Sequence, residues 1–92
     1  MKFVLLGSIS PSWIGKQAER YKKSNEKLKQ LGIKQVYVLY TQGQYDFVET
    51  IEASGPESVL GFTIWYSKKG FGSIQTLPAF EDQEIRKILK KG

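Results

Sequence analysis

The chain has 92 residues, enough for one domain spanning residues 1–92 that buries only about 60–68% of the surface its unfolded form exposes. It contains neither Cys nor His, which excludes disulfides, thiolate nucleophiles, Cys-ligated metal centres and imidazole general bases. Lys and Arg outnumber Asp and Glu by 14 to 9, and the net charge of +5 permits contact with nucleic acid or a membrane surface without requiring it.

The apolar segments are short. None approaches the length that spans a bilayer, and Phe3–Leu6 is too short for the apolar core of a signal peptide. We therefore expect a cytoplasmic protein without a membrane partner. No Lys or Arg occurs from Gln35 to Ser67, so this part of the chain is acidic, while the positive charge gathers before it and in the tail.

The first 31 residues indicate a strand followed by one long helix. Apolar residues on both alternating faces of Met1–Ser10 predict a strand. Pro11–Leu31 is predicted to be a helix that Ser10 or Ser12 caps and Gly32 ends. Its apolar stripe recurs at helical spacing and consists of Ile14, Ala18, Tyr21, Asn25 and Leu28.

A basic ridge lies on the opposite side of this predicted helix. It consists of Lys16, Arg20, Lys23 and Lys27. Such a ridge could bind phosphate, but no aromatic residue is interleaved with it, so we interpret it as a solvated helix face.

A polar turn, Gly43–Asp46, separates two apolar segments that we predict to be paired strands, Ile33–Tyr40 and Phe47–Ala53. Gly43 tolerates a positive φ, and Asp46 can accept hydrogen bonds from nearby backbone N–H groups. The first of the two strands is apolar on both faces and therefore requires cover on both.

Glu49 lies in the middle of the second of these strands, where side chains alternate between the two faces of the sheet. If that strand is central, burial desolvates the carboxyl and raises its pKa, as in many functional acids. The alternative is a carboxylate that pairs with a Lys or faces a wet interface. The sequence leaves both interpretations open.

The rest of the chain predicts a buried helix, a strand and a terminal helix. Pro56–Lys69 has little polar circumference, which indicates a helix that is buried on more than one side and ends at a glycine. Phe71–Ala79 is predicted to be a strand in which Pro78 requires either an edge position or a place among the last residues. Asp82–Lys91 is predicted to be a short helix, capped by Asp82 and docked on the body or on a partner.

The predicted order βαββαβ is that of the ferredoxin-like, or split βαβ, α+β fold. Two right-handed crossovers place both helices on one face of a four-stranded antiparallel sheet and leave the other face bare. Because the strand Ile33–Tyr40 is apolar on both sides, we expect two copies to pack their bare faces together as a dimeric α+β barrel. The expected partner is therefore the chain itself, in a homodimer or a higher even oligomer.

One stretch of the sequence resembles a known family. The residues Gly43-Gln44-Tyr45-Asp46, followed by Phe47-Val48 and Ile51-Glu52-Ala53, resemble the GYD domain family, in which a Gly-x-Tyr-Asp turn precedes an apolar strand. Gly72–Phe80 is similar to the last strand of that family, whereas Ser54–Glu57 departs from its more acidic helix start. The resemblance implies a small dimeric α+β barrel and no established activity.

The same turn also resembles the effector-binding domain of Lrp/AsnC-type regulators. The resemblance implies the same topology and the binding of small ligands, such as amino acids, between subunits. This chain would be a stand-alone version, because it lacks the helix-turn-helix part. The long Pro11–Leu31 helix fits that family less well.

We predict a ligand-binding or regulatory dimer rather than an enzyme, with a site at the subunit interface and neither cofactor nor metal. Tyr45 offers an amphipathic ring and Asp46 could fix an ammonium group, although the ring could instead pack in the interface and the carboxylate could only cap the turn. Tyr40 and Glu49 complete the candidate ligand-binding set.

The alternative function is a cofactor-independent isomerase or a monooxygenase-like enzyme that uses a carboxylate and Tyr. Glu49 or Asp46 would be the base, and Tyr37, Tyr40 or Trp65 would line an apolar pocket. The absence of His weakens this hypothesis, because many such enzymes rely on one.

RNA binding on the sheet face is a third hypothesis, since RRM domains have the same topology. It is disfavoured because Phe71–Ala79 contains no Lys or Arg and Phe47–Ala53 is acidic. We do not expect a nucleic-acid partner.

Overall fold

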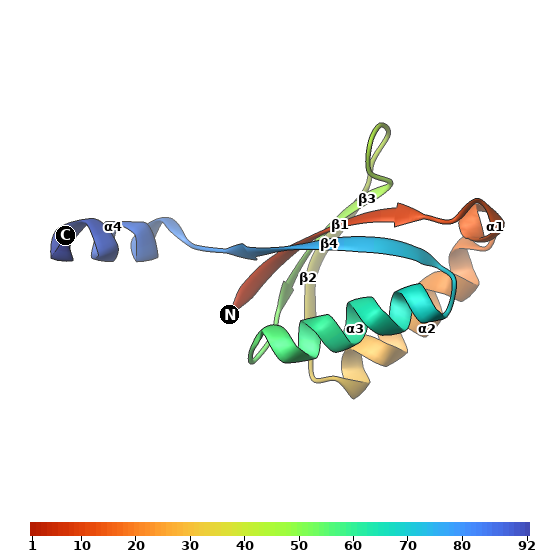
Figure 1. The fold of residues 1–92 in the computed structure, drawn as a ribbon, viewed down its shortest axis with the longest axis horizontal. Helices are drawn as coiled ribbons and strands as arrows, with labels where there is room; N and C mark the ends of the chain where they lie inside the picture. Colours follow the sequence, from red (N-terminus) through yellow and green to blue (C-terminus); the bar gives the residue numbers. More distant parts are fainter.

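The computed structural model describes residues 1–92, which form a four-stranded antiparallel sheet with two long helices on one face (Figure 1). The strands lie in the order β2-β3-β1-β4, and every neighbouring pair is antiparallel. This arrangement confirms the predicted ferredoxin-like α+β fold. In chain order the elements are β1 (Lys2–Ile9), α1 (Pro11–Ile14), α2 (Gln17–Gln30), β2 (Lys34–Tyr40), β3 (Phe47–Glu52), α3 (Pro56–Lys68), β4 (Gly72–Ala79) and α4 (Asp82–Lys91).

Strand alternation decides which side chains enter the core between the sheet and the helices. Phe3 and Leu5 of β1 point toward the helices, as do Phe47 and Ile51 of the neighbouring β3. The opposite wall is the apolar stripe of α3, whose members recur at helical spacing. The buried apolar residues are Phe3, Leu5, Leu28, Ile33, Phe47, Ile51, Ala53, Val59, Phe62, Tyr66 and Phe71.

The predicted single helix over Pro11–Leu31 is wrong, because the chain forms two helices, α1 and α2, with a break at Gly15 and Lys16. Gly15 ends α1 with φ −79° and ψ 0°, and the side chain of Ser10 forms no cap. The ring of Trp13 packs edge-on against Phe71 with 4.4 Å between ring centroids. This contact fixes α1 beside the start of β4, so α2 has to begin in a new direction.

The break changes which face of α2 is buried. Of the predicted apolar stripe only Leu28 is buried, whereas Ile14, Ala18 and Tyr21 are exposed. Arg20, which we predicted to lie on a solvated ridge, is buried. The predicted faces of this helix are therefore wrong around Arg20.

β2 and β3 form the predicted hairpin, and Gly43 in the turn has φ 128°. β2 is an edge strand whose register shifts between Gln35 and Tyr37, which leaves a bulge at Val36. Tyr37 and Leu39 point away from the helices and are 61% and 53% exposed. The two apolar faces predicted for this strand are therefore present, but one is uncovered in the single chain.

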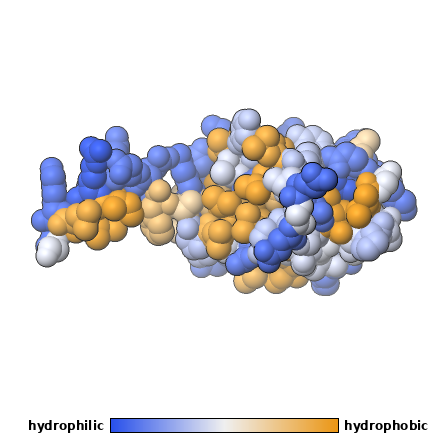
Figure 2. All heavy atoms as spheres, turned by 90° about the horizontal axis from the view of Figure 1, so that it is seen from above, coloured by the Kyte–Doolittle hydropathy of each residue, from blue (hydrophilic) through white to orange (hydrophobic).

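The sheet face opposite the helices is open and carries apolar patches among polar side chains (Figure 2). We call it the helix-free face. An apolar surface of this kind usually marks an interaction site. Its apolar residues are Val4, Leu6, Val36, Tyr37, Leu39, Val48 and Leu77.

β4 is the second edge strand, and Pro78 is its next-to-last residue, opposite Phe3 of β1, so both positions that the sequence allowed for this proline are met. The predicted cap of α4 by Asp82 is wrong. Glu81 is the N-cap residue instead, and it forms a capping box with Glu84 in which each side chain accepts the other residue's backbone N–H.

α4 projects beyond the body of the molecule (Figure 1). All its residues are exposed, including Ile85, Ile88 and Leu89 on its apolar side, and an ion pair between Lys2 and Glu81 links its start to β1. The predicted docking of this helix on its own body is therefore not observed. No helix combines the length and the apolar character needed to cross a membrane.

Candidate functional site

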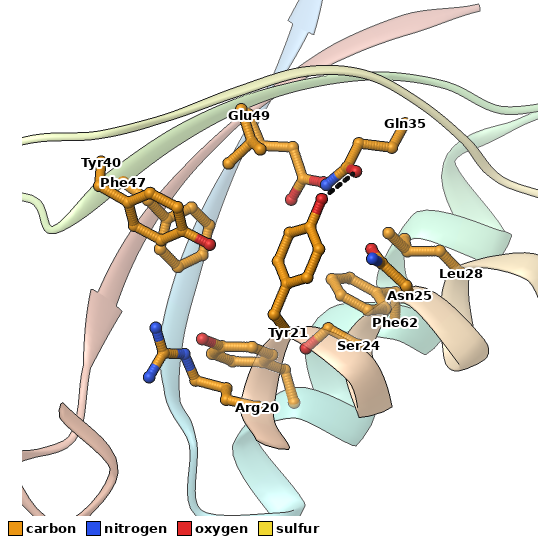
Figure 3. A pocket seen from close by; sticks show the side chains of 12 residues that line it. Arg20, Tyr21, Ser24, Asn25, Leu28, Gln35, Tyr40, Phe47, Glu49 and Phe62 are labelled. Carbon is orange, nitrogen blue, oxygen red and sulfur yellow. Dashed lines mark hydrogen bonds between the residues drawn. The ribbon is translucent and has the colours of Figure 1, made fainter. Parts of the chain in front are cut away.

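A small cavity of about 30 Å³ lies between α2, α3 and the helix-covered side of β2 and β3 (Figure 3). We call it the α2 cavity. Its free space is close to that of one water molecule. Its walls are Arg20, Tyr21, Ser24, Asn25, Leu28, Gln35, Val38, Tyr40, Phe47, Glu49, Phe62 and Tyr66.

Glu49 is the acid of this cavity. It lies on the interior strand β3 and is only 5% exposed. Its Oε2 accepts a hydrogen bond of 2.5 Å from Nε2 of Gln35, and it takes part in no ion pair. Burial raises the pKa of the Glu49 carboxyl, and the hydrogen bond from Gln35 only partly opposes this rise. Of the two sequence interpretations, the structure therefore favours the desolvated acid.

Arg20 is the cation of this cavity, and sequence reasoning missed it. The residue is 3% exposed, and its guanidinium donates a hydrogen bond of 2.8 Å to the carbonyl oxygen of Trp13 and another to Oε1 of Gln17. Both acceptors are neutral. The signal that could have found Arg20 is its spacing of four and eight residues from Ser24 and Leu28, which continues the buried stripe of α2.

Three tyrosine side chains surround the remaining space. Burial raises the pKa of Tyr66 to about 12, although the nearby charge of Arg20 opposes this rise. The hydroxyl of Tyr40 points into the space between Arg20 and Glu49 (Figure 3). The hydroxyl of Tyr21 lies 3.4 Å from Oε1 of Gln35, a long and therefore weak hydrogen bond.

Ser24 supplies a further polar atom to the cavity wall. Its hydroxyl oxygen is buried and has no hydrogen-bond partner in the single chain. Buried polar groups are nearly always satisfied by protein, water or ligand. The α2 cavity thus contains an acid, a cation and an unpaired hydroxyl within aromatic walls, a set that can hydrogen-bond a ligand and exchange a proton with it.

The predicted site residues lie on two sides of the sheet. Tyr40 and Glu49 meet in the α2 cavity. Tyr45 lies outside it, and its hydroxyl donates a hydrogen bond of 2.6 Å to Gln75, a β4 residue on the helix-free face. Asp46 also lies outside the cavity, where its Oδ2 accepts a hydrogen bond of 2.6 Å from the backbone N–H of Ile9 and holds the turn against β1.

The other residues considered for an enzyme pocket are also separated from the cavity. Tyr37 points to the helix-free face, and Trp65 packs against Phe62 and Phe71 in the core. No cluster of three or more acidic side chains capable of holding a metal ion is present.

The likeness of the chain to solved structures concerns its fold. The chain is similar to 5-chloro-2-hydroxyhydroquinone dehydrochlorinase from Burkholderia phenoliruptrix, solved in complex with 2,5-dihydroxybenzoquinone. The two share 16% sequence identity and superpose with a TM-score of 0.64 over 91% of this chain and 98% of the other. At this identity the likeness shows a common fold.

Family membership follows from the sequence comparison. A search of curated proteins found no match. The family profile for the GYD domain matches residues 4–89, a span that includes the Gly43–Asp46 turn, the Glu49 strand and both long helices. The chain therefore belongs to the GYD domain family.

Proposed function

We propose that this GYD domain protein is a homodimer that binds a small molecule in the α2 cavity of each subunit. The observation that carries the proposal is the position of Glu49, a buried carboxyl that faces a cavity and has no cationic partner. Burying such a group lowers stability, and carboxyls in this position are common at functional sites. The structural neighbour was solved with a bound quinone, which adds support from another protein of the same fold.

The helix-free face supports the dimer. It exposes Tyr37, Leu39 and Leu77 on a chain too small to bury much surface alone. Each large apolar side chain that becomes fully buried contributes about 1.5–3 kcal/mol. Packing two such faces together hides the surface of both copies, so several of these contributions offset the loss of freedom on association.

Light scattering after size exclusion tests the dimer. We expect the wild type to have twice the 10.5 kDa mass of one chain. Leu39→Glu places a charge on the helix-free face and should give a monomer. Ile64→Glu is the matched control, because Ile64 is similarly exposed but lies on α3, on the other side of the sheet. A wild type that runs as a monomer would contradict the dimer.

A thermal-shift screen tests ligand binding. The library should contain amino acids, keto acids, phenols and aromatic acids. A ligand at ten times its Kd stabilises the native state by about 1.4 kcal/mol, which raises the Tm of a domain of this size by about 6 °C or more. We expect at least one compound class to produce such a shift.

Variants of two neighbouring acids then locate the site. Glu49→Gln should weaken binding of the compound about tenfold, since it changes the donor and acceptor that face the ligand. Glu52→Gln is the matched control, because Glu52 lies on the same strand but points to the opposite face. Equal binding by both variants, or no shift with any compound, would contradict a site in the α2 cavity.

A second candidate function is a cofactor-independent isomerase, which the raised pKa of Glu49 favours. The ionised Glu49 would take a proton from a carbon next to a ligand carbonyl and return it at another position. A hydroxyl of Tyr40 or Tyr66 would meanwhile hydrogen-bond the enolate oxygen. Incorporation of solvent deuterium into a bound keto compound, lost in Glu49→Gln, tests this. Binding without incorporation would reject the isomerase and leave the binding module.

A further inference from the structure

Arg20 is a buried charge without a counter-ion. None of the three ion pairs of the chain involves it, and its two hydrogen bonds go to neutral oxygens. A guanidinium has five N–H donors, so two remain for another acceptor even when the hydroxyl of Tyr66 takes one. Because an uncompensated buried charge is costly, this arrangement favours an anionic group as the missing partner.

Glu49 lies on the opposite side of the α2 cavity from Arg20 (Figure 3). The two side chains form no ion pair, so neither neutralises the other. The carboxyl of Glu49 forms hydrogen bonds in either protonation state. A ligand that spans the cavity therefore meets a cation at one end and this carboxyl at the other, while the unpaired hydroxyl of Ser24 lies on the α2 side (Figure 3).

Aromatic rings form the walls between these ends. Apart from Tyr21, four of the twelve lining residues are aromatic, and they come from both layers of the fold. Stacked and edge-on ring contacts favour a flat partner over a puckered one. The four are Tyr40, Phe47, Phe62 and Tyr66.

The ring of Tyr21 fills part of the space that such a ligand needs. The free volume of about 30 Å³ holds a water but no six-membered ring. Tyr21 is 39% exposed, its ring lies between α2 and the Gln35–Glu49 pair, and its only side-chain hydrogen bond is long (Figure 3). Rotation of this one side chain toward solvent would open the cavity and break only one weak hydrogen bond.

We infer that the α2 cavity takes a small planar aromatic acid, whose anionic group pairs with Arg20 and whose second oxygen forms a hydrogen bond with Glu49, and that the ring of the ligand displaces the ring of Tyr21. The inference rests on the proposed binding function and specifies its ligand class.

Matched probes test the ligand class on the wild-type protein. Para-hydroxybenzoate and para-hydroxybenzamide differ in charge, and benzoate and cyclohexanecarboxylate differ in planarity. Titration by NMR should show that para-hydroxybenzoate binds about tenfold more tightly than para-hydroxybenzamide, and benzoate about tenfold more tightly than cyclohexanecarboxylate. A tenfold difference in Kd corresponds to about 1.4 kcal/mol of binding free energy. Equal binding within either pair overturns the inference.

Variants test the roles of the two side chains. Arg20→Met should abolish the preference for the acid over the amide, while Arg20→Lys should keep it, because only the second retains the charge. Tyr21→Ala should bind para-hydroxybenzoate more tightly, since no ring has to be displaced. Weaker binding by Tyr21→Ala would mean that Tyr21 is a wall of the site and would overturn its displacement. If Arg20→Met does not fold, the inference is still tested by the wild-type protein and by Arg20→Lys, both of which should prefer the acid to the amide.

The outcomes separate this inference from the proposed function. Glu49-dependent binding of a non-aromatic compound, with none of the aromatic acids binding, overturns the ligand class and leaves the binding module. Failure of every compound in both series overturns the inference and the proposed function together.

Discussion

The ring of Phe47 lies directly against the backbone of Gly7, its partner residue on the neighbouring strand. A Cβ on Gly7 would come within 2.0 Å of Cζ of Phe47, where no atom fits. The same ring makes edge-on contacts with Tyr40 and Tyr66. Gly7 thus allows Phe47 to hold two tyrosines of the α2 cavity in place.

Substitution of this glycine is the first prediction. Gly7→Ala should destabilise the protein by about 1–3 kcal/mol, because Phe47 has to move out of a packed core. Urea unfolding followed by tryptophan fluorescence measures the effect. Gly15→Ala is the control, since a Cβ there meets nothing within 4 Å and φ is −79°. An equal loss in both variants would contradict the contact.

The second prediction concerns Glu49 and pH. Its folded pKa is raised above the ordinary 4.5, so the native state holds the proton more tightly than the unfolded state. The resulting stabilisation is fully present below pH 4.5 and is lost as pH rises through the folded pKa. Glu49→Gln stays neutral and should gain stability relative to the wild type over that window. Urea unfolding at several pH values measures the gain, with Glu52→Gln as the control that should show none.

The third prediction concerns Tyr66. Because its pKa is raised to about 12, one of the five tyrosines should ionise well after the ordinary value of 10. The native state resists this ionisation, so stability should fall as pH rises from about 10 to about 12. Absorbance of tyrosinate during alkaline titration should show the late step. Tyr66→Phe should remove it, whereas Tyr37→Phe, at an exposed position, should leave it in place.

The fourth prediction concerns α4. This helix has ten residues and all are exposed in the single chain, whereas an isolated helix of that length is marginal in water. Its amides should exchange rapidly with deuterium in the monomeric Leu39→Glu variant. Slower exchange of residues 82–91 in the wild type would show that the second copy covers the apolar side of α4. Equal exchange in both proteins would place α4 outside the dimer contact.

The fold was readable from the sequence because β-strand alternation and helix breakers agree with each other. Pro78 lies near the end of an edge strand, in agreement with the positions that the sequence allowed it. For Glu49 the sequence left two interpretations open, and the structure shows a buried carboxyl. The faces of α2 were not readable around Arg20. A single glycine, Gly15, interrupts the helix, and the contact of Trp13 with Phe71 sets the new direction. That contact joins residues far apart in sequence, which no local pattern reports.

The site was only half predictable for a related reason. Tyr40 and Glu49 come from paired strands, so hairpin register brings them together. Arg20 and Ser24 join them from a helix whose phase depends on the same long-range contact. Whether Tyr45 and Asp46 bind a ligand stays a prediction. In the structure both hold the turn to other strands through hydrogen bonds.

The two edge strands of the sheet, β2 and β4, are poorly suited to pairing with strands of another chain. The bulge at Val36 disturbs the row of backbone hydrogen-bonding groups on β2, and Pro78 of β4 lacks an amide proton. Such devices discourage other chains from adding strands side by side, which is the route to fibrous aggregates. Two copies can thus pack face to face through their sheets, while pairing through the edge strands into extended sheets is disfavoured.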